Sequence, residues 1–256
     1  MPKTVVRAVI AGQRKLSNDV YELVFAAPEI ARQAVPGQFV HVRVSEPDSA
    51  DPLLRRPLSI ADVDRQHNTV SVIYRVVGRG TARLAKLQAQ ENIDCLGPLG
   101  RGFTLRGERP LLIGGGMGIA PLQYLAKKLC PRPVEILLGG RTREEMFWQD
   151  MFASICQDIH ITTDDGSLGQ RGVAPDVLPD LLEQKSFDMI YCCGPHPMLV
   201  SVAKIAQGIN IPCQVSLEEY MACGIGACLS CTCAAKDGSR KKICTDGPVF
   251  WAGEVI

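Results

Sequence analysis

The stretch Pro110-Leu-Leu-Ile-Gly-Gly-Gly-Met-Gly-Ile-Ala-Pro121 decides the fold class of this 256-residue chain. Its first four residues have the length and apolar character of a buried strand, and a helical pattern follows the glycines. A tight glycine turn between a strand and a helix is typical of a doubly wound parallel sheet. The alternation continues, which predicts an α/β domain over residues 103–215. Its other expected strands are 134–138, 159–163, 188–192 and 213–217, and its helices 144–152, 177–184 and 197–207.

Residues 1–102, on the N-terminal side of this stretch, are β-rich. Short runs of β-branched and aromatic residues alternate with turn-formers such as Pro36-Gly37. Several short strands at this spacing predict an antiparallel barrel or sandwich. A single helix is expected at 81–88, and residues 95–102 look like the hinge out of this domain. The expected strands are residues 5–10, 20–26, 38–44, 58–63 and 69–77.

Residues 216–256, on the C-terminal side, carry Cys223-Gly-Ile-Gly-Ala-Cys228-Leu-Ser-Cys231 and, further on, Cys244. Three thiols spaced C-x4-C-x2-C with a fourth downstream match the plant-type [2Fe–2S] ligand pattern. Glycines within the loop let its backbone approach a compact cluster. We therefore expect a small cluster-binding segment whose iron ligands are these four cysteines.

Two other uses of these cysteines have to be considered. A zinc site usually pairs two C-x2–4-C units, whereas here Cys228 and Cys231 have only Cys244 as a second half. A thioredoxin-like redox pair would lack its usual position after a strand of that fold. Cys233 is left over and is expected to be a non-ligand. The six other cysteines of the eleven are scattered through apolar surroundings and are expected to behave as small hydrophobic residues.

The bulk properties exclude several classes of function. The formal net charge is +1, so no basic surplus exists to neutralise nucleic-acid phosphates. No apolar run approaches the roughly 20 residues that a membrane span needs. The first residues lack the apolar core of a signal peptide, which leads us to expect a cytoplasmic protein.

Two motifs in the β-rich domain suit a phosphate-bearing ligand. Arg56-Pro57-Leu58-Ser59 begins an expected strand, and an arginine fork suits a pyrophosphate, although alone it could be a charged strand edge. Ile73-Tyr74-Arg75 comes shortly before Gly80-Thr81, which opens a helix whose free N–H groups favour phosphate. The two motifs, one strand apart, support each other.

The α/β domain offers a dinucleotide site at two turns. Gly114, Gly115, Gly116 and Gly118 form the first, although Pro121 replaces the third glycine of G-x-G-x-x-G and the turn could be a mere tight corner. Cys193-Gly194-Pro195 ends the fourth strand, where ligands of such sheets bind. Residues 163–167 could touch a ribose or form a solvated turn. Arg141 and Arg143 follow the second strand, where an NADP enzyme recognises the 2′-phosphate, so NADPH remains open although NADH is favoured.

Together these motifs resemble the ferredoxin–NADP reductase superfamily over nearly the whole chain. The C-terminal motifs, C-G-I-G-A-C-x-x-C and I-C-T-D-G-P-V-F, look most like the family of electron transfer subunits of dihydroorotate dehydrogenase B. The resemblance implies an FAD-binding barrel, an NAD-binding α/β domain and a [2Fe–2S] segment. Leu58 stands where many reductases carry an aromatic against the flavin. The implied FAD contacts are Arg56, Pro57, Leu58, Ser59, Ile73, Tyr74, Arg75, Gly80 and Thr81.

The family also implies a function. NADH delivers a hydride to the flavin, and the cluster passes single electrons to an FMN-containing catalytic subunit that links orotate and dihydroorotate to NAD in pyrimidine biosynthesis. The implied assembly is a heterotetramer of two catalytic and two electron transfer subunits. Alternatives of similar architecture are the gamma subunit of a sulfhydrogenase and the small subunit of an NADH-dependent ferredoxin:NADP reductase. A redox-sensing module is a further alternative, but a sensor needs no hydride donor.

Overall fold

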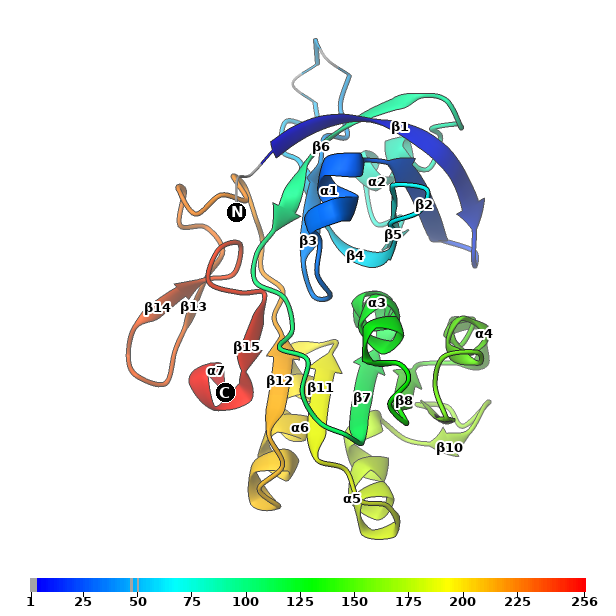
Figure 1. The fold of residues 1–256 in the computed structure, drawn as a ribbon, viewed down its shortest axis with the longest axis vertical. Coiled ribbons are helices and arrows are strands. Elements are labelled where there is room, and N and C mark those ends of the chain that lie inside the picture. Colours follow the sequence, from blue (N-terminus) through cyan, green and yellow to red (C-terminus); the bar gives the residue numbers. More distant parts are fainter. Residues whose placement is uncertain (1–3, 47, 50) are drawn as a thin grey trace.

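The computed structural model describes residues 4–46, 48–49 and 51–256. A β-barrel lies at one end of the molecule and an α/β unit at the other, as Figure 1 shows. The C-terminal segment runs along one side, next to both. The combination of an antiparallel barrel with an α/β sheet confirms the fold class expected from the sequence.

The barrel is closed by six antiparallel strands in the order β1-β2-β5-β4-β3-β6. Strand β6 pairs with both β1 and β3 and so closes the barrel, whereas its second half was expected to be a hinge. That expectation was wrong because Gly97-Pro98 interrupts the β pattern and shifts the register against β3 but does not end the strand. Two short helices, α1 (Pro28–Gln33) and α2 (Arg79–Leu84), join these strands. The strands are β1 (Thr4–Lys15), β2 (Val20–Ala26), β3 (Phe39–Val42), β4 (Arg56–Asp64), β5 (Thr69–Arg75) and β6 (Asn92–Leu99).

Alternation along β3, β4 and β5 gives the barrel an inner and an outer face. Val40, Leu58 and Val72 belong to the barrel core. Their neighbours Phe39 and Ile73 belong instead to the two cores shared with the rest of the chain. The outer face of these strands is therefore the side on which the barrel meets the other units.

The α/β unit contains a seven-stranded sheet in the order β10-β9-β8-β7-β11-β12-β15. All neighbours are parallel except β15, which runs antiparallel to β12 and comes from the C-terminal segment. The sequence did not predict this last strand. The strands are β7 (Pro110–Gly115), β8 (Glu135–Gly140), β9 (Asp158–Thr163), β10 (Gln170–Arg171), β11 (Met189–Cys193), β12 (Cys213–Ser216) and β15 (Val249–Trp251).

Helices cover both faces of this sheet. Helices α3 (Ala120–Leu129) and α4 (Trp148–Phe152) share one apolar core with it, while α5 (Ala174–Gln184) and α6 (His196–Gly208) share another. Strands β8, β9 and β10 are added on one side of β7, and β11 and β12 on the other. The strand order therefore reverses between β7 and β11, and ligands of doubly wound sheets bind at such a switch point. The helix expected at 144–152 is shorter, because a 3-10 turn, η2 (Arg143–Glu145), precedes α4. A second 3-10 turn, η1 (Gly116–Ile119), leads into α3.

The C-terminal segment packs against the side of both larger units. Its hairpin of β13 (Thr232–Ala234) and β14 (Arg240–Lys242) projects to one side, and α7 (Ala252–Val255) follows β15. Phe250 is buried in one core with Phe39 of the barrel and Val215 of the sheet. Among the helices of the described residues, none has the length and apolar character to cross a membrane.

Candidate functional site

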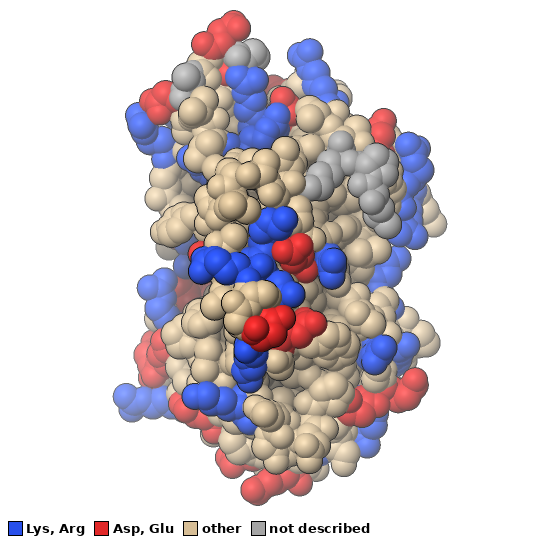
Figure 2. All heavy atoms as spheres, turned by 90° about the vertical axis from the view of Figure 1, so that its left-hand side faces the viewer, with Lys and Arg blue, Asp and Glu red and all other residues tan. Residues whose placement is uncertain are grey.

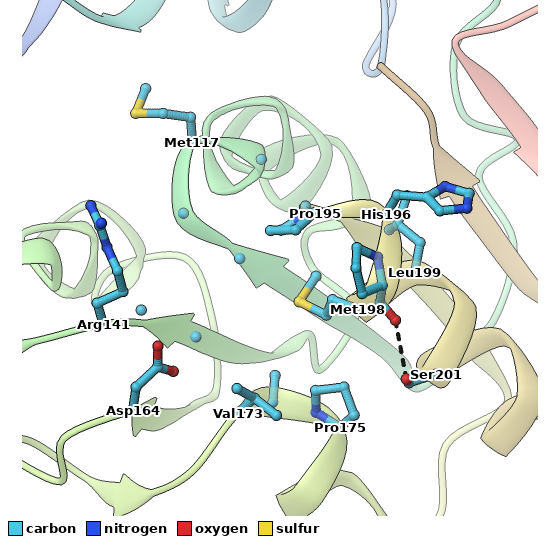
Figure 3. A pocket seen from close by; sticks show the side chains of 18 of the residues that line it. Met117, Arg141, Asp164, Val173, Pro175, Pro195, His196, Met198, Leu199 and Ser201 are labelled. Atoms are coloured by element: carbon cyan, nitrogen blue, oxygen red, sulfur yellow. Dashed lines mark hydrogen bonds between the residues drawn. The ribbon is translucent and has the colours of Figure 1, made fainter. Parts of the chain in front are cut away.

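A cavity of about 840 Å³ opens at the switch point between β7 and β11. Gly115, Gly116 and Gly118 line it from the first turn, and Gly194 and Pro195 from the second. Figure 3 shows Arg141 and Asp164 on one side of this pocket and His196 on the other. The volume suits a sizeable organic ligand, and the two turns that the sequence singled out lie side by side.

The glycines allow the two turns to touch backbone to backbone. A Cβ on Gly118 would lie 2.5 Å from the backbone nitrogen of Gly194, and one on Gly115 would lie 2.7 Å from Sδ of Met198. Gly114 serves packing instead, because its Cβ would lie 2.7 Å from Cγ1 of Ile119. The incomplete G-x-G-x-x-G pattern therefore reflects a close turn-to-turn contact beneath the pocket.

The side chain of Cys193 lies in the core and not on the pocket wall. It is buried among residues of β7, α3 and β11, and only its neighbour Gly194 is among the lining residues. Burial raises the pKa of this thiol well above its usual range. The side chain is therefore a neutral thiol that shapes the turn, with no nucleophilic role.

An ion-pair network closes the end of the pocket near the barrel. Arg141 Nη2 lies 2.7 Å from Glu145 Oε1, and the Arg141 backbone N–H donates to Glu145 Oε2 at 3.0 Å. Arg75 of β5 reaches the same carboxylate at 3.3 Å and also Asp19 at 3.2 Å. Burial alone would raise the pKa of Glu145, but hydrogen bonds and charge from Arg141, together with Arg75, hold it below its usual range. Glu145, which the sequence analysis missed, thus links the barrel to the pocket.

Residues of the barrel motifs fall on two faces. Pairing of Phe39 with Ser59 places Ser59 on the outer face, and Ile73 and Arg75 share that side of β5. Tyr74 is in the barrel core, where its hydroxyl donates to Gln13 Oε1 at 2.9 Å, and the inward-facing Leu58 joins the same core. The outer face carries the side chains available to a ligand held between the two units.

Arg56 lies against the first turn of α2, as the paired motifs suggested. A Cβ on Gly80 would lie 3.2 Å from both Nε and Nη2 of Arg56. Thr81 Oγ1 accepts the backbone N–H of Val77 at 3.0 Å, which fixes the turn before the helix. The glycine lets the Arg56 guanidinium come close to the start of the helix, and a guanidinium in that position is suited to a phosphate group.

The cysteine loop has the backbone that a cluster requires. Gly224 and Gly226 have φ angles of +68° and +85°, a region that favours glycine. The backbone N–H groups of Ile225 and Cys228 each donate to Cys223 Sγ at 3.4 Å. Partial burial acts to raise the pKa of the Cys223 thiol, but these N–H groups outweigh it and lower that pKa to about 6. The loop therefore favours the thiolate form of Cys223, which is the form of cysteine that ligates metals.

The fourth cysteine reaches this loop through the hairpin. Ile243 N–H donates to the carbonyl of Cys231 at 2.9 Å, so Cys244 follows directly beside Cys231. Both are buried, whereas Cys228 is exposed. Among the described residues, no three Cys, His, Asp or Glu side chains converge as ligands of a single metal ion would. A [2Fe–2S] cluster shares four thiolates between two irons, and Cys223, Cys228, Cys231 and Cys244 match that donor set in number and kind.

His41 lies where the barrel meets the cysteine loop. The side chain is on β3, and a Cβ on Gly224 would lie 2.6 Å from its Nδ1. Burial, with the positive charge of Arg55, lowers the pKa of His41 to about 4. The imidazole is therefore neutral at physiological pH. No motif in the sequence pointed to this residue.

Three domain families match the chain. The oxidoreductase FAD-binding domain matches residues 7–103 and the oxidoreductase NAD-binding domain residues 112–204. The iron–sulfur cluster binding domain of dihydroorotate dehydrogenase B matches residues 218–256. The chain thus carries FAD-binding, NAD-binding and iron–sulfur cluster-binding domains, as the motifs predicted.

Whole-length relatives decide the family. The electron transfer subunit of dihydroorotate dehydrogenase B (NAD⁺) from Bacillus caldolyticus is 44% identical over 258 residues, which cover 98% of each chain. The chain belongs to the family of dihydroorotate dehydrogenase B electron transfer subunits. The family member from Shouchella clausii is 43% identical over the full length of both chains.

Solved structures share the fold of this chain. A structure of the NADH-dependent reduced ferredoxin-NADP oxidoreductase has a TM-score of 0.87 at 32% identity, covering 100% of this chain and 91% of that chain. A ferredoxin NADP⁺ reductase from Neisseria gonorrhoeae shares the fold at a TM-score of 0.67 and 18% identity, covering 81% of this chain and 91% of that one. The higher identity to the electron transfer subunits favours their family over the NADH-dependent ferredoxin:NADP reductase alternative.

Proposed function

We propose that this chain oxidises NADH through FAD and passes the electrons, through a [2Fe–2S] cluster, to the FMN-containing catalytic subunit of a dihydroorotate dehydrogenase B. One observation carries the proposal. The three sites form a continuous series, because Arg75 joins the nucleotide pocket to the outer face of the barrel and His41 joins that face to the cysteine loop. The working units are residues 1–102, 103–215 and 216–256.

The pocket at the switch point holds NADH. Backbone groups of Gly115, Gly116, Gly118, Gly194 and Pro195 surround the dinucleotide, while Gly114 and Cys193 support the turns from below. Arg141 is the side chain that would meet a 2′-phosphate, but it is ion-paired with Glu145. The Asp164 carboxylate lines the same side of the pocket. A pocket with these charges favours NADH over NADPH.

FAD lies between the two units. Ser59, Ile73 and Arg75 face it from the outer side of the barrel, and Pro57 shares their face. Arg56, Gly80 and Thr81 receive its phosphates, whereas Leu58 and Tyr74 support the strands from the barrel core. When bound, FAD supplies the change from two-electron to one-electron transfer. The residues of the chain orient it between donor and cluster.

The cysteine loop is the exit of the relay. Exposed Cys228 lies among the apolar side chains of Tyr220, Ile225 and Leu229, which are 93%, 46% and 61% exposed. Figure 2 shows the side of the molecule that carries the hairpin, where basic and acidic groups lie near the middle and uncharged surface lies around them. Exposed apolar residues around a redox centre suit a docking protein. The proposed partner is the catalytic subunit, assembled with this one as two of each.

The proposed location is the cytoplasm. All eleven cysteines lie in the described part of the chain, and none of them forms a disulfide, not even neighbours such as Cys231 and Cys244. Thiols stay reduced in the cytoplasm, where NADH is also available.

Replacement of Cys228 by alanine tests the exit. Because the Cys228 side chain is exposed, its replacement does not disturb the core. The C228A variant should therefore reduce FAD with NADH at the wild-type rate. It should fail to support orotate reduction in the complex with the catalytic subunit. The matched control is C233A, which lies in the same segment and should keep the cluster and full electron delivery. Wild-type orotate reduction by C228A would refute the cluster as exit. Loss of the cluster in C233A would refute the ligand set.

A further inference from the structure

His41 shares a surface with the residues expected to face the flavin. In the β3–β4 pairing, His41 lies opposite Pro57 and Phe39 lies opposite Ser59. Val40 and Val42 point into the barrel core, so His41 points outward with Phe39. The imidazole therefore stands next to the flavin side of β4.

The other side of the ring is covered by the cysteine loop. A Cβ on Gly224 would lie 2.6 Å from Nδ1 and 3.2 Å from Cε1 of His41. Gly224 follows Cys223, an expected iron ligand, and its φ of +68° keeps the loop backbone against the ring. Only glycine permits this approach, so the loop and the imidazole are built for contact.

The ring has an unused hydrogen-bonding capacity. His41 is fully buried, and among the described residues neither Nδ1 nor Nε2 has a hydrogen-bond partner. A neutral imidazole carries one N–H donor, and buried donors in proteins are nearly always paired. Arg55 donates to the His41 carbonyl at 3.3 Å. Backbone groups of Arg55 and Cys223 lie close enough to the ring to raise its pKa somewhat, but neither forms a regular hydrogen bond with a ring nitrogen. The missing acceptor is therefore to be sought in the group that the cysteines hold.

We infer that His41 donates a hydrogen bond to the sulfur atoms of the [2Fe–2S] site and thereby raises the reduction potential of the cluster. The inference rests on the proposed function. Hydrogen bonds to cluster sulfurs are a main determinant of such potentials, because they stabilise the more negative, reduced form. The position beside β4 makes His41 the residue that adjusts the cluster to the flavin that reduces it.

Redox titration of the intact holoprotein, followed by the electron paramagnetic resonance of the reduced cluster, tests this inference. His41→Leu fills the space without a donor, whereas His41→Asn and His41→Gln each keep an N–H near one ring nitrogen. His41→Leu should shift the flavin–cluster equilibrium about tenfold towards oxidised cluster, the value of one charge-assisted hydrogen bond. For a one-electron couple this is about 59 mV. At least one amide variant should recover most of the shift, and the FAD potential should not change.

Two outcomes of that titration overturn the inference. One is a wild-type cluster potential in His41→Leu with full iron and sulfide content. The other is an equal shift in all three variants, which would indicate packing alone. His160→Gln is the control, because His160 is on β9 and bonds Glu135 at 2.8 Å. It should leave the potential unchanged.

A second measurement covers the case in which His41→Leu does not assemble. Wild-type protein labelled with ¹⁵N only in histidine should show a ¹⁵N coupling to the reduced cluster in pulsed resonance spectra. The coupling should persist in His160→Gln and disappear in His41→Gln. Absence of any histidine coupling in the wild type overturns the inference. A wild-type protein without a cluster signal, or with a flavin that NADH does not reduce, would instead refute the proposed function.

Discussion

At the scale of single residues, the shape of the nucleotide pocket depends on glycine at position 118, which has no Cβ atom. Gly118 and Gly194 meet backbone to backbone, and a Cβ on Gly118 would come within 2.5 Å of the neighbouring nitrogen. Because the obstructing atom is backbone, the added methyl cannot be relieved by a side-chain rotation. The two turns would have to separate.

Gly118→Ala should therefore weaken both stability and NADH binding. Overpacking of this kind lowers the free energy of unfolding by about 1–3 kcal/mol. Gly208→Ala is the matched control, because a Cβ there meets nothing within 4 Å, and a helical alanine should leave stability unchanged or raise it by up to about 1 kcal/mol. Urea unfolding and NADH titration measure the two effects. Wild-type NADH affinity in Gly118→Ala would show that the turn contact does not shape the site.

The residues that the sequence could reveal are those with a local signature. The spacing of Cys223, Cys228 and Cys231 indicates the iron–sulfur site without any structure. Glu145 and His41 have no such signature, because their importance comes from Arg75 and Gly224, which are distant in the chain. Such residues are found only when the fold brings their partners together.

At the scale of elements, the segment between β8 and α4 determines the charge of the ribose end of the pocket. Glu145 binds Arg141 through three hydrogen bonds and reaches Arg75 of the barrel. The Glu145 carboxylate thus offsets the positive charge of Arg141, which would otherwise attract a 2′-phosphate.

Glu145→Gln should shift the enzyme towards NADPH. Removing the carboxylate frees Arg141, and kcat/KM for NADPH should rise roughly fivefold, about 1 kcal/mol, while the value for NADH changes less. Glu144→Gln is the control, since Glu144 is in the same segment but bonds the Thr142 hydroxyl. Steady-state kinetics with both nucleotides provide the measurement. If the ratio of kcat/KM for NADPH to kcat/KM for NADH stays unchanged in Glu145→Gln, this segment does not recognise the ribose.

Strands with an uninterrupted local pattern were predicted well, and those with a broken or very short pattern were not. The period of the sequence located β7, β8, β9 and β11 within a few residues. Strands β6 and β15 escaped because Gly97-Pro98 breaks the pattern of one and the other has only three residues. Pairing with β1 defines the former and pairing with β12 the latter, and neither pairing can be read from the pattern of the strand itself.

At the scale of the whole molecule, the cluster segment is part of the common core. Phe250 is 5% exposed and packs in a core that also includes Phe39 of the barrel and Leu199 of α6. The cluster-binding segment is therefore held at a fixed place relative to the barrel and the α/β unit.

Phe250→Ala should destabilise the chain as a unit. Loss of a buried phenylalanine lowers the free energy of unfolding by about 3–5 kcal/mol. Tyr220→Ala is the aromatic control in the same segment, and with 93% exposure its change should stay within about 0.5 kcal/mol. Denaturant unfolding, monitored by flavin release and by the cluster absorbance, should show both signals lost in one shifted transition. If the cluster is lost while the flavin stays bound at wild-type stability, the segment is a separate unit.

The central claim is that one chain carries electrons from NADH through FAD to the cluster. Anaerobic stopped-flow mixing of the purified protein with NADH, with samples frozen for electron paramagnetic resonance, tests it most directly. Bleaching of the flavin should come first, followed by the signal of a reduced [2Fe–2S] cluster. A flavin that stays oxidised with excess NADH, or a cluster that stays oxidised after the flavin is reduced, would contradict the relay.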